Sequence, residues 1–378
     1  MKKLAIIGST GSIGRQVLQV VDAYKSDFEV YSLTAGGNSS LLFEQINKYK
    51  PTVATLESSS LQTFDGTRFF SGKDAYLSAI TEEVDLVVVA VVGFAGLKAV
   101  LKAIKLKKDI ALANKECLVA GGGLVMENAR RNGVKIFPVD SEHSAIYQAL
   151  GLDKNKPFKR LILTASGGAF RDLSLDKLSR AKAKDALKHP NWDMGAKITI
   201  DCATLVNKAF EVIEAHWLYN ADYSKIDAVI HRESIIHSMV EFEDNSVLAQ
   251  MSYPTMELPI QLALFDGERF SSTVKSLDFT AIKSLTFDKI DNQKFPCFDL
   301  VVSAGKKGGL YPTIANGANE VAVKAFLEDK INFTGIYSLI EDALNAYTYT
   351  VDYSLDAVLD ADRFAREFTI NQIKKYYR

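Results

Sequence analysis

Two acidic residues near the middle of the chain have the spacing expected of metal ligands. Asp140 and Glu142 lie in the segment Val139-Asp140-Ser141-Glu142-His143, directly after a predicted strand. Residues two apart in an extended chain point to the same side, so the two carboxylates can converge. Converging carboxylates repel each other unless a cation lies between them, and Mg²⁺ or Mn²⁺ prefers such oxygen ligands. The structural alternative is that Asp140 caps a helix and Glu142 lies in its first turn.

A third carboxylate ligand could come from a helix predicted over residues 204–218. Glu211 lies four residues after Asn207 and three after Lys208, which places the three side chains on one helical face. If that face only meets solvent, Glu211 has no part in a site. The spacing therefore indicates a divalent metal site and leaves the structural alternative open.

Two further segments suit a phosphorylated substrate. Ala165-Ser166-Gly167-Gly168 follows a predicted strand and offers a hydroxyl group and backbone amides, which are groups that bind phosphate. His189-Pro190-Asn191-Trp192-Asp193-Met194-Gly195 is rich in aromatic and polar residues, as in a loop that closes over a ligand. A plain turn and a plain surface loop are the alternatives.

A glycine-rich segment follows the first predicted strand and opens a helix near Ile13. In Gly8-Ser9-Thr10-Gly11-Ser12-Ile13-Gly14 the glycines permit a tight turn and a close approach to a pyrophosphate, whose charge then rests on the helix N-terminus. The end of the second strand reads Thr34-Ala35-Gly36-Gly37-Asn38, without the carboxylate that usually holds the ribose 2′-hydroxyl of NAD. The sequence therefore favours NADP(H) over NAD.

Other candidate residues also lie at strand ends. Ala113-Asn114-Lys115-Glu116 ends a predicted strand at the carboxyl edge, where open α/β sheets bind ligands, and Lys115 can reach the nicotinamide or the substrate. His231 and His237 bracket another strand. A lone histidine is more often a hydrogen-bonded structural residue than a catalyst.

The elements that must position these residues follow a βα alternation. Apolar runs separated by amphipathic segments imply parallel βαβ units. The predicted strands of this series are residues 3–7, 28–33, 53–56, 86–92, 109–113, 135–139 and 160–164. After a strand at 227–230 the pattern changes, because residues 235–242 and 247–252 are typical of an antiparallel hairpin. Helical periodicity then predicts helices at 298–306, 313–328, 334–347 and 355–375.

These elements predict an α/β protein with three parts. The N-terminal part is a Rossmann-like dinucleotide-binding domain, the central part is an α+β catalytic domain with a mixed sheet, and the C-terminal part is a helical bundle. The predicted boundaries are 1–130 for the first domain, 131–272 for the second with a lid loop at about 166–196, 273–297 for a linker and 298–378 for the bundle.

Composition excludes several classes of protein. The 378 residues carry a formal net charge of −1, which argues against general nucleic-acid binding. The longest apolar run, residues 86–92, is far shorter than the roughly 20 residues that cross a bilayer, and Gly8 interrupts the apolar N-terminus too early for a signal peptide. We therefore expect a cytoplasmic protein without a membrane partner. Cys117, Cys202 and Cys297 are scattered and indicate neither disulfides nor a thiolate zinc site.

Taken together, these motifs closely resemble the 1-deoxy-D-xylulose 5-phosphate reductoisomerase family over essentially the whole chain. The resemblance also includes Ser234-Ile235-Ile236-His237-Ser238-Met239-Val240 and Ala315-Asn316-x-x-Asn319-Glu320. It implies conversion of 1-deoxy-D-xylulose 5-phosphate to 2-C-methyl-D-erythritol 4-phosphate with NADPH and a divalent metal (Mg²⁺, Mn²⁺ or Co²⁺), in the non-mevalonate isoprenoid pathway. It also implies retro-aldol cleavage and re-addition before hydride transfer, and a homodimer joined through the central domain.

The resemblance assigns roles to matching positions of this chain. The implied metal ligands are Asp140, Glu142 and Glu211. The implied catalytic residues are Lys115, Glu116, Ser141, Glu142 and Lys208. The implied substrate-binding residues are Ser141, Ser166, His189, Trp192, Met194, Cys202, Asn207, Lys208, His237 and Met256. The implied cofactor-binding residues are Gly8, Thr10, Gly11, Ser12, Ile13, Gly14, Gly36, Gly37, Asn38, Ala90, Asn114, Lys115, Glu116 and Gly195.

Two positions depart from the family pattern. Cys202 stands where the family usually has a phosphate-binding serine, so we expect a modest loss of substrate affinity. Gly37 stands where many members have a basic residue facing the 2′-phosphate, so we expect a weaker preference for NADPH over NADH. Two other functions compete with this interpretation: a metal-free NADP-dependent sugar-phosphate dehydrogenase, and a non-catalytic NADP-binding sensor.

Overall fold

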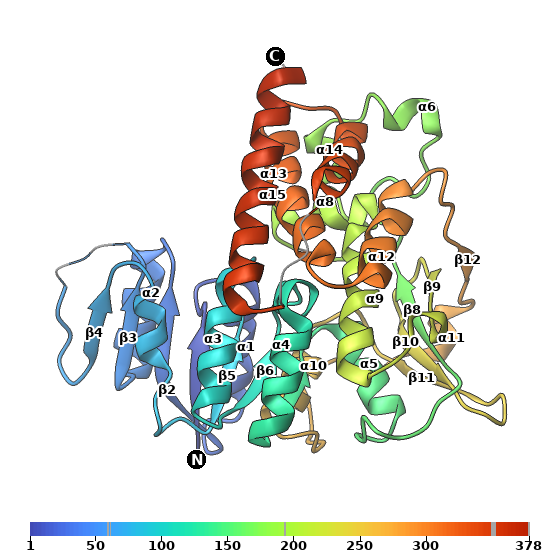
Figure 1. Ribbon diagram of the computed structural model, residues 1–378. Coiled ribbons are helices and arrows are strands. Elements are labelled where there is room, and N and C mark those ends of the chain that lie inside the picture. The colour runs from blue at the N-terminus through green and yellow to red at the C-terminus, as the bar shows by residue number, and fades with distance from the viewer. Residues whose placement is uncertain (59, 61, 193, 349–352, 377–378) are drawn as a thin grey trace. The chain divides into compact units, whose positions relative to one another are not determined.

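The computed structural model describes residues 1–58, 60, 62–192, 194–348 and 353–376 (Figure 1). The chain forms two compact units, each assembled from separate stretches. Unit 1 comprises Met1–Cys117, Val125–Ser144 and Thr255–Val274. Unit 2 comprises Leu118–Leu124, Ala145–Pro254 and Lys275–Arg378.

Unit 1 is built on a seven-stranded parallel sheet in the order β4-β3-β2-β1-β5-β6-β7. The apolar runs form strands because both faces of such a sheet are covered, and β1, β3 and β5 are almost wholly buried. Six of the strands match the sequence prediction. The strands are β1 Lys2–Ile7, β2 Phe28–Ala35, β3 Val53–Leu56, β4 Arg68–Ser71, β5 Leu86–Val89, β6 Asp109–Leu112 and β7 Ile136–Pro138.

Strand β4 was not predicted. It lies at the edge of the sheet, beside β3, and three of its four residues are exposed. An exposed edge strand of this length lacks the buried apolar run by which the other strands are recognised.

Helices α1, α2 and α3 of unit 1 bury one apolar face each, whereas residues 259–264 of α10 are buried all round. In α1 the buried side chains include Val17, Leu18 and Val21, and aromatic rings join α10 to this helix, since Phe265 packs edge to face with Tyr24 and Phe28. The helices are α1 Ser12–Ala23, α2 Ser39–Tyr49, a short 3-10 helix η1 Ala75–Ala79, α3 Ala95–Lys105, α4 Glu116–Asn132 and α10 Glu257–Leu264.

Unit 2 contains a five-stranded mixed sheet in the order β11-β10-β8-β9-β12. The pair β8 and β9 is parallel and the other pairs are antiparallel. The predicted hairpin is confirmed as β10 and β11. The strands are β8 Arg160–Ala165, β9 Ile226–Ile230, β10 Ile236–Glu241, β11 Val247–Met251 and β12 Asp288–Lys289.

The rest of unit 2 is helical, and the four predicted C-terminal helices are confirmed within two residues at each end. In this group α13 packs against α12, α14 and α15 (Figure 1). The helices that involve unit 2 are α5 Ser141–Ala149, α6 Leu175–Leu178, α7 Ala183–Ala186, α8 Ala196–Thr204, α9 Val206–Tyr219, η2 Tyr223–Lys225, α11 Phe279–Ile282, α12 Pro296–Lys307, α13 Tyr311–Leu327, α14 Phe333–Ala346 and α15 Leu355–Tyr376. The predicted α/β fold class is confirmed. Within residues 273–297, α11 and β12 form, and β12 adds an edge strand to the sheet.

The helix predicted to begin at Thr204 begins at Val206 instead. Leu205 adopts a left-handed conformation, with φ of 60°, and separates α8 from α9. Its side chain is 2% exposed and packs with Ala165, Ile230 and Phe295. This buried packing stabilises the left-handed conformation, which leucine rarely adopts.

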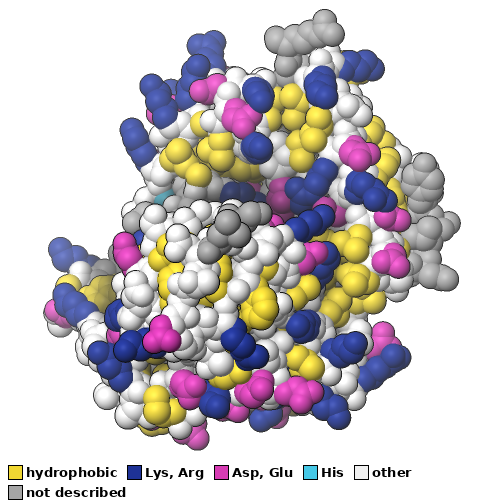
Figure 2. Space-filling model, turned by 90° about the vertical axis from the view of Figure 1, so that its left-hand side faces the viewer, with side chains coloured by type: hydrophobic (Ala, Val, Ile, Leu, Met, Phe, Trp, Pro, Cys, Tyr) yellow, Lys and Arg dark blue, Asp and Glu magenta, His cyan; other side chains and the backbone are white. Residues whose placement is uncertain are grey.

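No helix in the described part of the chain is long and apolar enough to cross a membrane. Figure 2 shows Lys and Arg side chains intermixed with Asp and Glu over the face that it displays, as expected for a formal net charge of −1.

Candidate active site

The glycine-rich loop of unit 1 has a backbone that only glycine permits at two positions. Gly8 has a φ of +94°, and a Cβ atom on it would lie 2.8 Å from the carbonyl oxygen of Ala90. A Cβ atom on Gly14 would lie 2.2 Å from the carbonyl oxygen of Gly8. Gly11 precedes α1, which begins at Ser12, and its carbonyl accepts a hydrogen bond from Arg15. The loop thus turns directly into a helix N-terminus, the geometry that binds a pyrophosphate.

Strand β2 holds this loop in place. The Gly8 amide donates to Thr34 Oγ1 at 2.8 Å, and the Ser9 amide donates to the Thr34 carbonyl at 2.8 Å. The buried Ser9 hydroxyl also bonds Gln45 at 2.7 Å. Of the residues expected to bind cofactor, Thr10, Ser12 and Ile13 therefore lie in or next to a fixed turn, and Ala90 lies against it.

The end of β2 leads into α2 through Gly36, Gly37 and Asn38. Asn38 caps α2 by accepting a hydrogen bond from the Leu41 amide at 3.2 Å. No described atom lies within 4 Å of the place where a Cβ atom on Gly37 would stand. A carboxylate from the next strand does lie close: Glu57 Oε2 is 3.6 Å from the Cβ position of Gly36. Sequence reasoning considered only the end of β2 and missed Glu57.

At the carboxyl ends of β6 and β7, Lys115 meets the first predicted metal ligand. Lys115 Nζ lies 2.6 Å from Asp140 Oδ2, and both side chains are largely buried. Asn114 donates to Glu116 Oε2 at 3.0 Å and to the carbonyl of Gly93 at 2.9 Å, which fixes the segment that begins α4. These predicted residues are therefore close together within unit 1.

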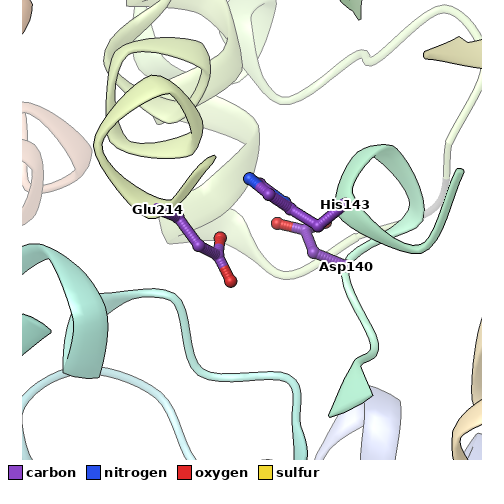
Figure 3. A group of neighbouring side chains, drawn as sticks. All are labelled: Asp140, His143 and Glu214. Carbon is purple, nitrogen blue, oxygen red and sulfur yellow. The ribbon is translucent and has the colours of Figure 1, made fainter. Parts of the chain in front are cut away.

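Ser141 and Glu142 begin α5 directly after Asp140. The Ser141 hydroxyl donates to Glu142 Oε2 at 2.6 Å. The Asp140 carbonyl accepts from the Ser144 amide at 2.8 Å, as a residue preceding a helix does, while its carboxylate pairs with Lys115. Figure 3 shows Asp140 and His143 on this connection and in the first turn of α5, and Glu214 on α9. His143 is fully buried, and sequence reasoning assigned it no role.

In unit 2, α9 presents the third predicted metal ligand. Asn207 Nδ2 donates to Glu211 Oε1 at 2.5 Å, and the Lys208 ammonium forms an ion pair with Glu211 Oε2. All three side chains are buried, and Glu211 is only 1% exposed. Glu211 therefore does not face solvent, and its charge is balanced within its own helix.

The Ser166-Gly167-Gly168 loop leaves β8 and packs against α8. A Cβ atom on Gly168, whose φ is +67°, would lie 2.4 Å from the carbonyl oxygen of Cys202. Ala165 and Leu205 share one buried cluster, so Ser166, which follows Ala165, and the start of α9, which follows Leu205, begin at neighbouring points. The Gly168 contact adds Cys202 to this region of unit 2, as a phosphate site would require.

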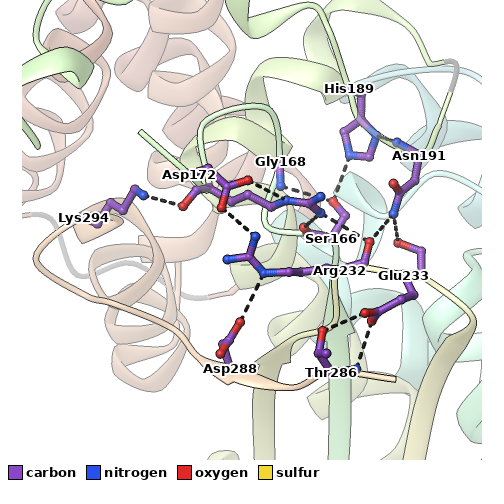
Figure 4. Close-up of polar contacts among 12 residues, drawn as sticks. Ser166, Gly168, Asp172, His189, Asn191, Arg232, Glu233, Thr286, Asp288 and Lys294 are labelled. Carbon is purple, nitrogen blue, oxygen red and sulfur yellow. Dashed lines mark hydrogen bonds and ion pairs between the residues drawn. The ribbon is translucent and has the colours of Figure 1, made fainter. Parts of the chain in front are cut away.

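His189 bonds the Ser166 hydroxyl, with 2.9 Å between Nε2 and Oγ (Figure 4). His189 Nδ1 accepts hydrogen bonds from the amides of Asn191 and Trp192, at 3.2 and 2.9 Å. The proton of the neutral ring is therefore on Nε2, and His189 donates to Ser166. Ser166 Oγ also accepts from the Gly168 amide at 3.2 Å.

Arg171 is a further cation in this region that sequence reasoning missed. Its Nη1 donates to the Ser166 carbonyl at 2.8 Å and to the Arg232 carbonyl at 3.3 Å. Burial and the charge of Arg171 lower the pKa of His189 to about 4. Arg232 lies beside it in an ionic network with Asp172 and Asp288 (Figure 4).

The remaining predicted substrate and cofactor residues lie at several places. Trp192 and His237 are in edge contact with ring centroids 6.1 Å apart, and His237 Nε2 lies 2.9 Å from Ser252 Oγ. Gly195 precedes α8, and Met194 precedes Gly195. Met256 precedes α10 in unit 1. Asp193, part of the predicted lid, is outside the described residues.

His231, by contrast, is a structural histidine. Its Nε2 accepts from the Ile235 and Ile236 amides, at 3.2 and 3.1 Å, and its Nδ1 lies 2.9 Å from the Thr286 carbonyl. It is fully buried. The ring therefore ties the β9–β10 connection to the segment before β12.

One unit has the α/β architecture that binds dinucleotides, and the other has a buried acidic residue beside groups suited to bind a phosphate. Together they indicate a nicotinamide-dependent enzyme that acts on a small anionic substrate. Comparisons with known proteins specify it further. Residues 4–122 match the family model "1-deoxy-D-xylulose 5-phosphate reductoisomerase", and residues 136–219 and 251–368 match models of the C-terminal domains of the same enzyme.

Similar proteins span the whole chain. A 1-deoxy-D-xylulose 5-phosphate reductoisomerase of Bacillus cereus is 46% identical over 375 residues, covering 97% of each chain. That of Gloeobacter violaceus is 48% identical and covers 97% of this chain and 96% of its own. A crystal structure of DOX-P reductoisomerase in complex with NADPH, fosmidomycin and magnesium is 37% identical, with a TM-score of 0.93 and coverage of 99% and 98%. The chain belongs to the 1-deoxy-D-xylulose 5-phosphate reductoisomerase family.

Proposed function

We propose that this chain performs its family's reaction with a divalent metal held by Asp140, Glu142 and Glu211 and NADPH held by the Gly8–Gly14 loop. The reaction converts 1-deoxy-D-xylulose 5-phosphate to 2-C-methyl-D-erythritol 4-phosphate with NADPH and a metal ion. The assignment of residues rests on two ion pairs. Asp140 and Glu211, two of the three carboxylates, each pair with a lysine inside their own unit.

The acidic residues suit a hard divalent ion. Buried carboxylates are costly unless a cation compensates them, and here Lys115 and Lys208 supply single positive charges. The donors are all oxygen atoms, the ligand type of Mg²⁺ and Mn²⁺. This supports the prediction that Asp140, Glu142 and Glu211 would hold the ion, with Lys115 and Lys208 then turned toward substrate oxygens.

The chain's own groups prepare the substrate for this chemistry. When bound, the metal polarises the substrate carbonyl as a Lewis acid and NADPH supplies a hydride. Lys115 and Lys208, once separated from their carboxylates, are ammonium donors for substrate oxygens. Ser141 orients Glu142 through its hydrogen bond, and Glu116, held by Asn114, is placed to accept or return a proton.

Ser166 is the group best prepared for the substrate phosphate. Its oxygen already accepts from the His189 ring and the Gly168 amide, so its own hydroxyl proton is directed to another acceptor. A phosphate oxygen supplies that acceptor, and Asn207 and Lys208 add donors from α9. In this proposal Cys202 borders the phosphate, and Trp192, Met194, His237 and Met256 contact the rest of the substrate.

Several other features of the sequence analysis stay predictions. These are the domain boundaries at 130, 272 and 297, the homodimer and the cytoplasmic location. The homodimer is directly measurable by sedimentation of the purified chain.

The decisive experiment is NADPH oxidation, followed by its near-ultraviolet absorbance, with 1-deoxy-D-xylulose 5-phosphate and roughly millimolar Mg²⁺ or Mn²⁺. We expect turnover that disappears after EDTA treatment and in Glu142→Gln. Turnover that survives both changes would instead favour a metal-free dehydrogenase. Cofactor binding without any turnover, with or without metal, would favour a non-catalytic sensor.

A further inference from the structure

In unit 2, Arg171 folds back across the loop that begins at Ser166. A Cβ atom on Gly167, whose φ is +83°, would lie 2.9 Å from Arg171 Cβ and 3.2 Å from Arg171 Cδ. The preceding side chain, Phe170, is 2% exposed and packs edge to face with Phe333. The glycine therefore leaves room for the arginine side chain, and the buried phenylalanine fixes the backbone from which it starts.

The Arg171 guanidinium bonds two backbone carbonyls. Its Nη1 atom donates to the Ser166 carbonyl at 2.8 Å and to the Arg232 carbonyl at 3.3 Å. Arg232 lies in the connection between β9 and β10, so one cation joins the Ser166 loop to that connection. Only 19% of the Arg171 side chain is exposed, and hydrogen bonds from a charged donor are stronger than neutral ones.

The same carbonyl also holds the lid segment, residues 189–192. Asn191 Nδ2 donates to the Arg232 carbonyl at 2.7 Å (Figure 4). The lid segment contacts the Ser166 hydroxyl as well, through the His189 ring. The Ser166 loop and the lid segment therefore share one anchor in the β9–β10 connection.

The lid segment requires a neutral His189 ring. Nδ1 of this ring accepts hydrogen bonds from the Asn191 and Trp192 amides. Protonation would put a hydrogen atom on Nδ1, and both contacts would then join two donors. Burial and the nearby charge of Arg171 oppose this protonation and lower the pKa of His189 to about 4.

The charge of Arg171 is only partly offset. Its Nε atom lies 3.4 Å from Asp172 Oδ2, but Asp172 is largely exposed and pairs more closely with Arg232, at 2.6 Å. The other charged groups of the network bond partners other than the Arg171 guanidinium. These groups are Glu233, Asp288 and Lys294, on the β9–β10 connection and the segment before α12 (Figure 4).

We propose that Arg171 is a positioning residue for the substrate phosphate, because it fixes the Ser166 loop and the lid segment to the β9–β10 connection. It acts through Ser166 and His189 and does not itself touch the substrate. The proposal rests on the proposed placement of the phosphate at Ser166.

The test compares Arg171→Met with Arg171→Lys in steady-state kinetics with 1-deoxy-D-xylulose 5-phosphate, NADPH and Mg²⁺. We expect Arg171→Met to raise the KM for the sugar phosphate about tenfold, the effect of losing hydrogen bonds from a charged donor, and to change kcat less. Arg171→Lys keeps a charged donor, so its KM should lie between those of the wild type and Arg171→Met. Arg363→Met, which removes an exposed arginine from α15, is the control and should leave KM unchanged.

A second measurement separates this role from simple packing. NMR titration of His189 in the free protein should show a higher pKa in Arg171→Met than in the wild type, still below 6.5 because burial remains, and little change in Arg171→Lys. The pH at which KM begins to rise on acidification should move upward in Arg171→Met alone. If Arg171→Met does not fold by circular dichroism, Arg171→Gln replaces it, since glutamine keeps a donor but lacks the charge.

Two outcomes would overturn the proposal. One is an unchanged KM in the uncharged variant. The other is an equal rise in KM in the charged and uncharged variants with the His189 titration unmoved, which would leave Arg171 only a packing role. Failure of the proposed function is seen separately, because the wild-type chain would then show no turnover with substrate, NADPH and metal.

Discussion

Lys115 Nζ lies 2.6 Å from Asp140 Oδ2 and so joins the carboxyl ends of the neighbouring strands β6 and β7. One carboxylate therefore has two competing partners in the proposed cycle, a lysine and a divalent ion. Because a divalent ion carries the larger charge and prefers several oxygen ligands, Asp140 would pair with the ion in preference to Lys115 when the site is filled. Metal binding would then release the Lys115 ammonium for the substrate.

Asp140→Asn should lower turnover at least about a hundredfold, because the substitution removes a charged metal ligand. NADPH affinity should change much less than turnover, since the glycine-rich loop is held by Thr34 and Ala90 and not by Asp140. The measurement is kcat as a function of Mg²⁺ concentration, with calorimetry for NADPH. Asp342→Asn, which neutralises an exposed carboxylate on α14, is the control. An unchanged Mg²⁺ dependence in Asp140→Asn would exclude Asp140 as a ligand.

Gly14→Ala should abolish cofactor binding or prevent folding of the loop, because the new Cβ atom would lie 2.2 Å from the Gly8 carbonyl oxygen. Gly133→Ala, at the C-cap of α4, is the control for a glycine-to-alanine change outside the loop, since nothing described lies within 4 Å of its Cβ position, although its φ of +67° adds some backbone strain. Circular dichroism separates loss of fold from loss of binding. Normal NADPH affinity in Gly14→Ala would show that the loop can relax without cost.

Cys202→Ser should lower the KM for the sugar phosphate about threefold to tenfold, the effect of one added hydrogen bond, and leave kcat nearly unchanged. The Cys202 carbonyl packs on Gly168, so the Cys202 backbone is next to the Ser166 loop. Cys297→Ser tests a buried thiol on α12 instead and should not lower KM. An unchanged KM in Cys202→Ser refutes a role for this hydroxyl.

The acidic pKa of His189 predicts a pH effect on stability. The folded state holds this pKa at about 4, below the ordinary value of 6.5, because burial and Arg171 oppose the charged ring. The unfolded chain therefore binds more protons between these values, and the stability of the fold falls as the pH drops through that window. Above about pH 6.5 the ring is neutral in both the folded and the unfolded state, so this loss of stability is absent. NMR titration of His189, and the pH dependence of urea unfolding in His189→Gln, measure it; a ring that titrates near its ordinary value would contradict the burial argument.

Asn319→Leu should destabilise the protein by about 1–3 kcal/mol, because a buried acceptor loses its donor. Asn319 Nδ2 donates to Asp201 Oδ1 at 2.8 Å, and both residues are nearly inaccessible. Since Asp201 adjoins Cys202, we also expect a higher KM for the phosphate substrate. Asn345→Leu, on the nearby helix α14, is a control for the helical region. Urea unfolding and KM together check the prediction.

The α/β alternation, the hairpin and the C-terminal helices were predictable because each has its own periodicity along the chain. The edge strand β4 and the short strand β12 were not, since neither buries an apolar face. Glu57 was missed for another reason: its closeness to Gly36 depends on the register of β2 against β3, which no local pattern in the sequence contains. Arg171 likewise lies near His189 only because the loop after β8 folds back.

The left-handed residue Leu205 has a consequence for protein engineering. It ends α8 and starts α9, so Cys202 and the Asn207–Glu211 cluster belong to two separately terminated helices. Substitutions at the end of α8 can therefore be screened for binding of substrates with other anionic groups. They should leave the position of α9, which carries Glu211, unchanged. A library confined to positions around 202 would vary substrate preference while the acidic cluster on α9 stays constant.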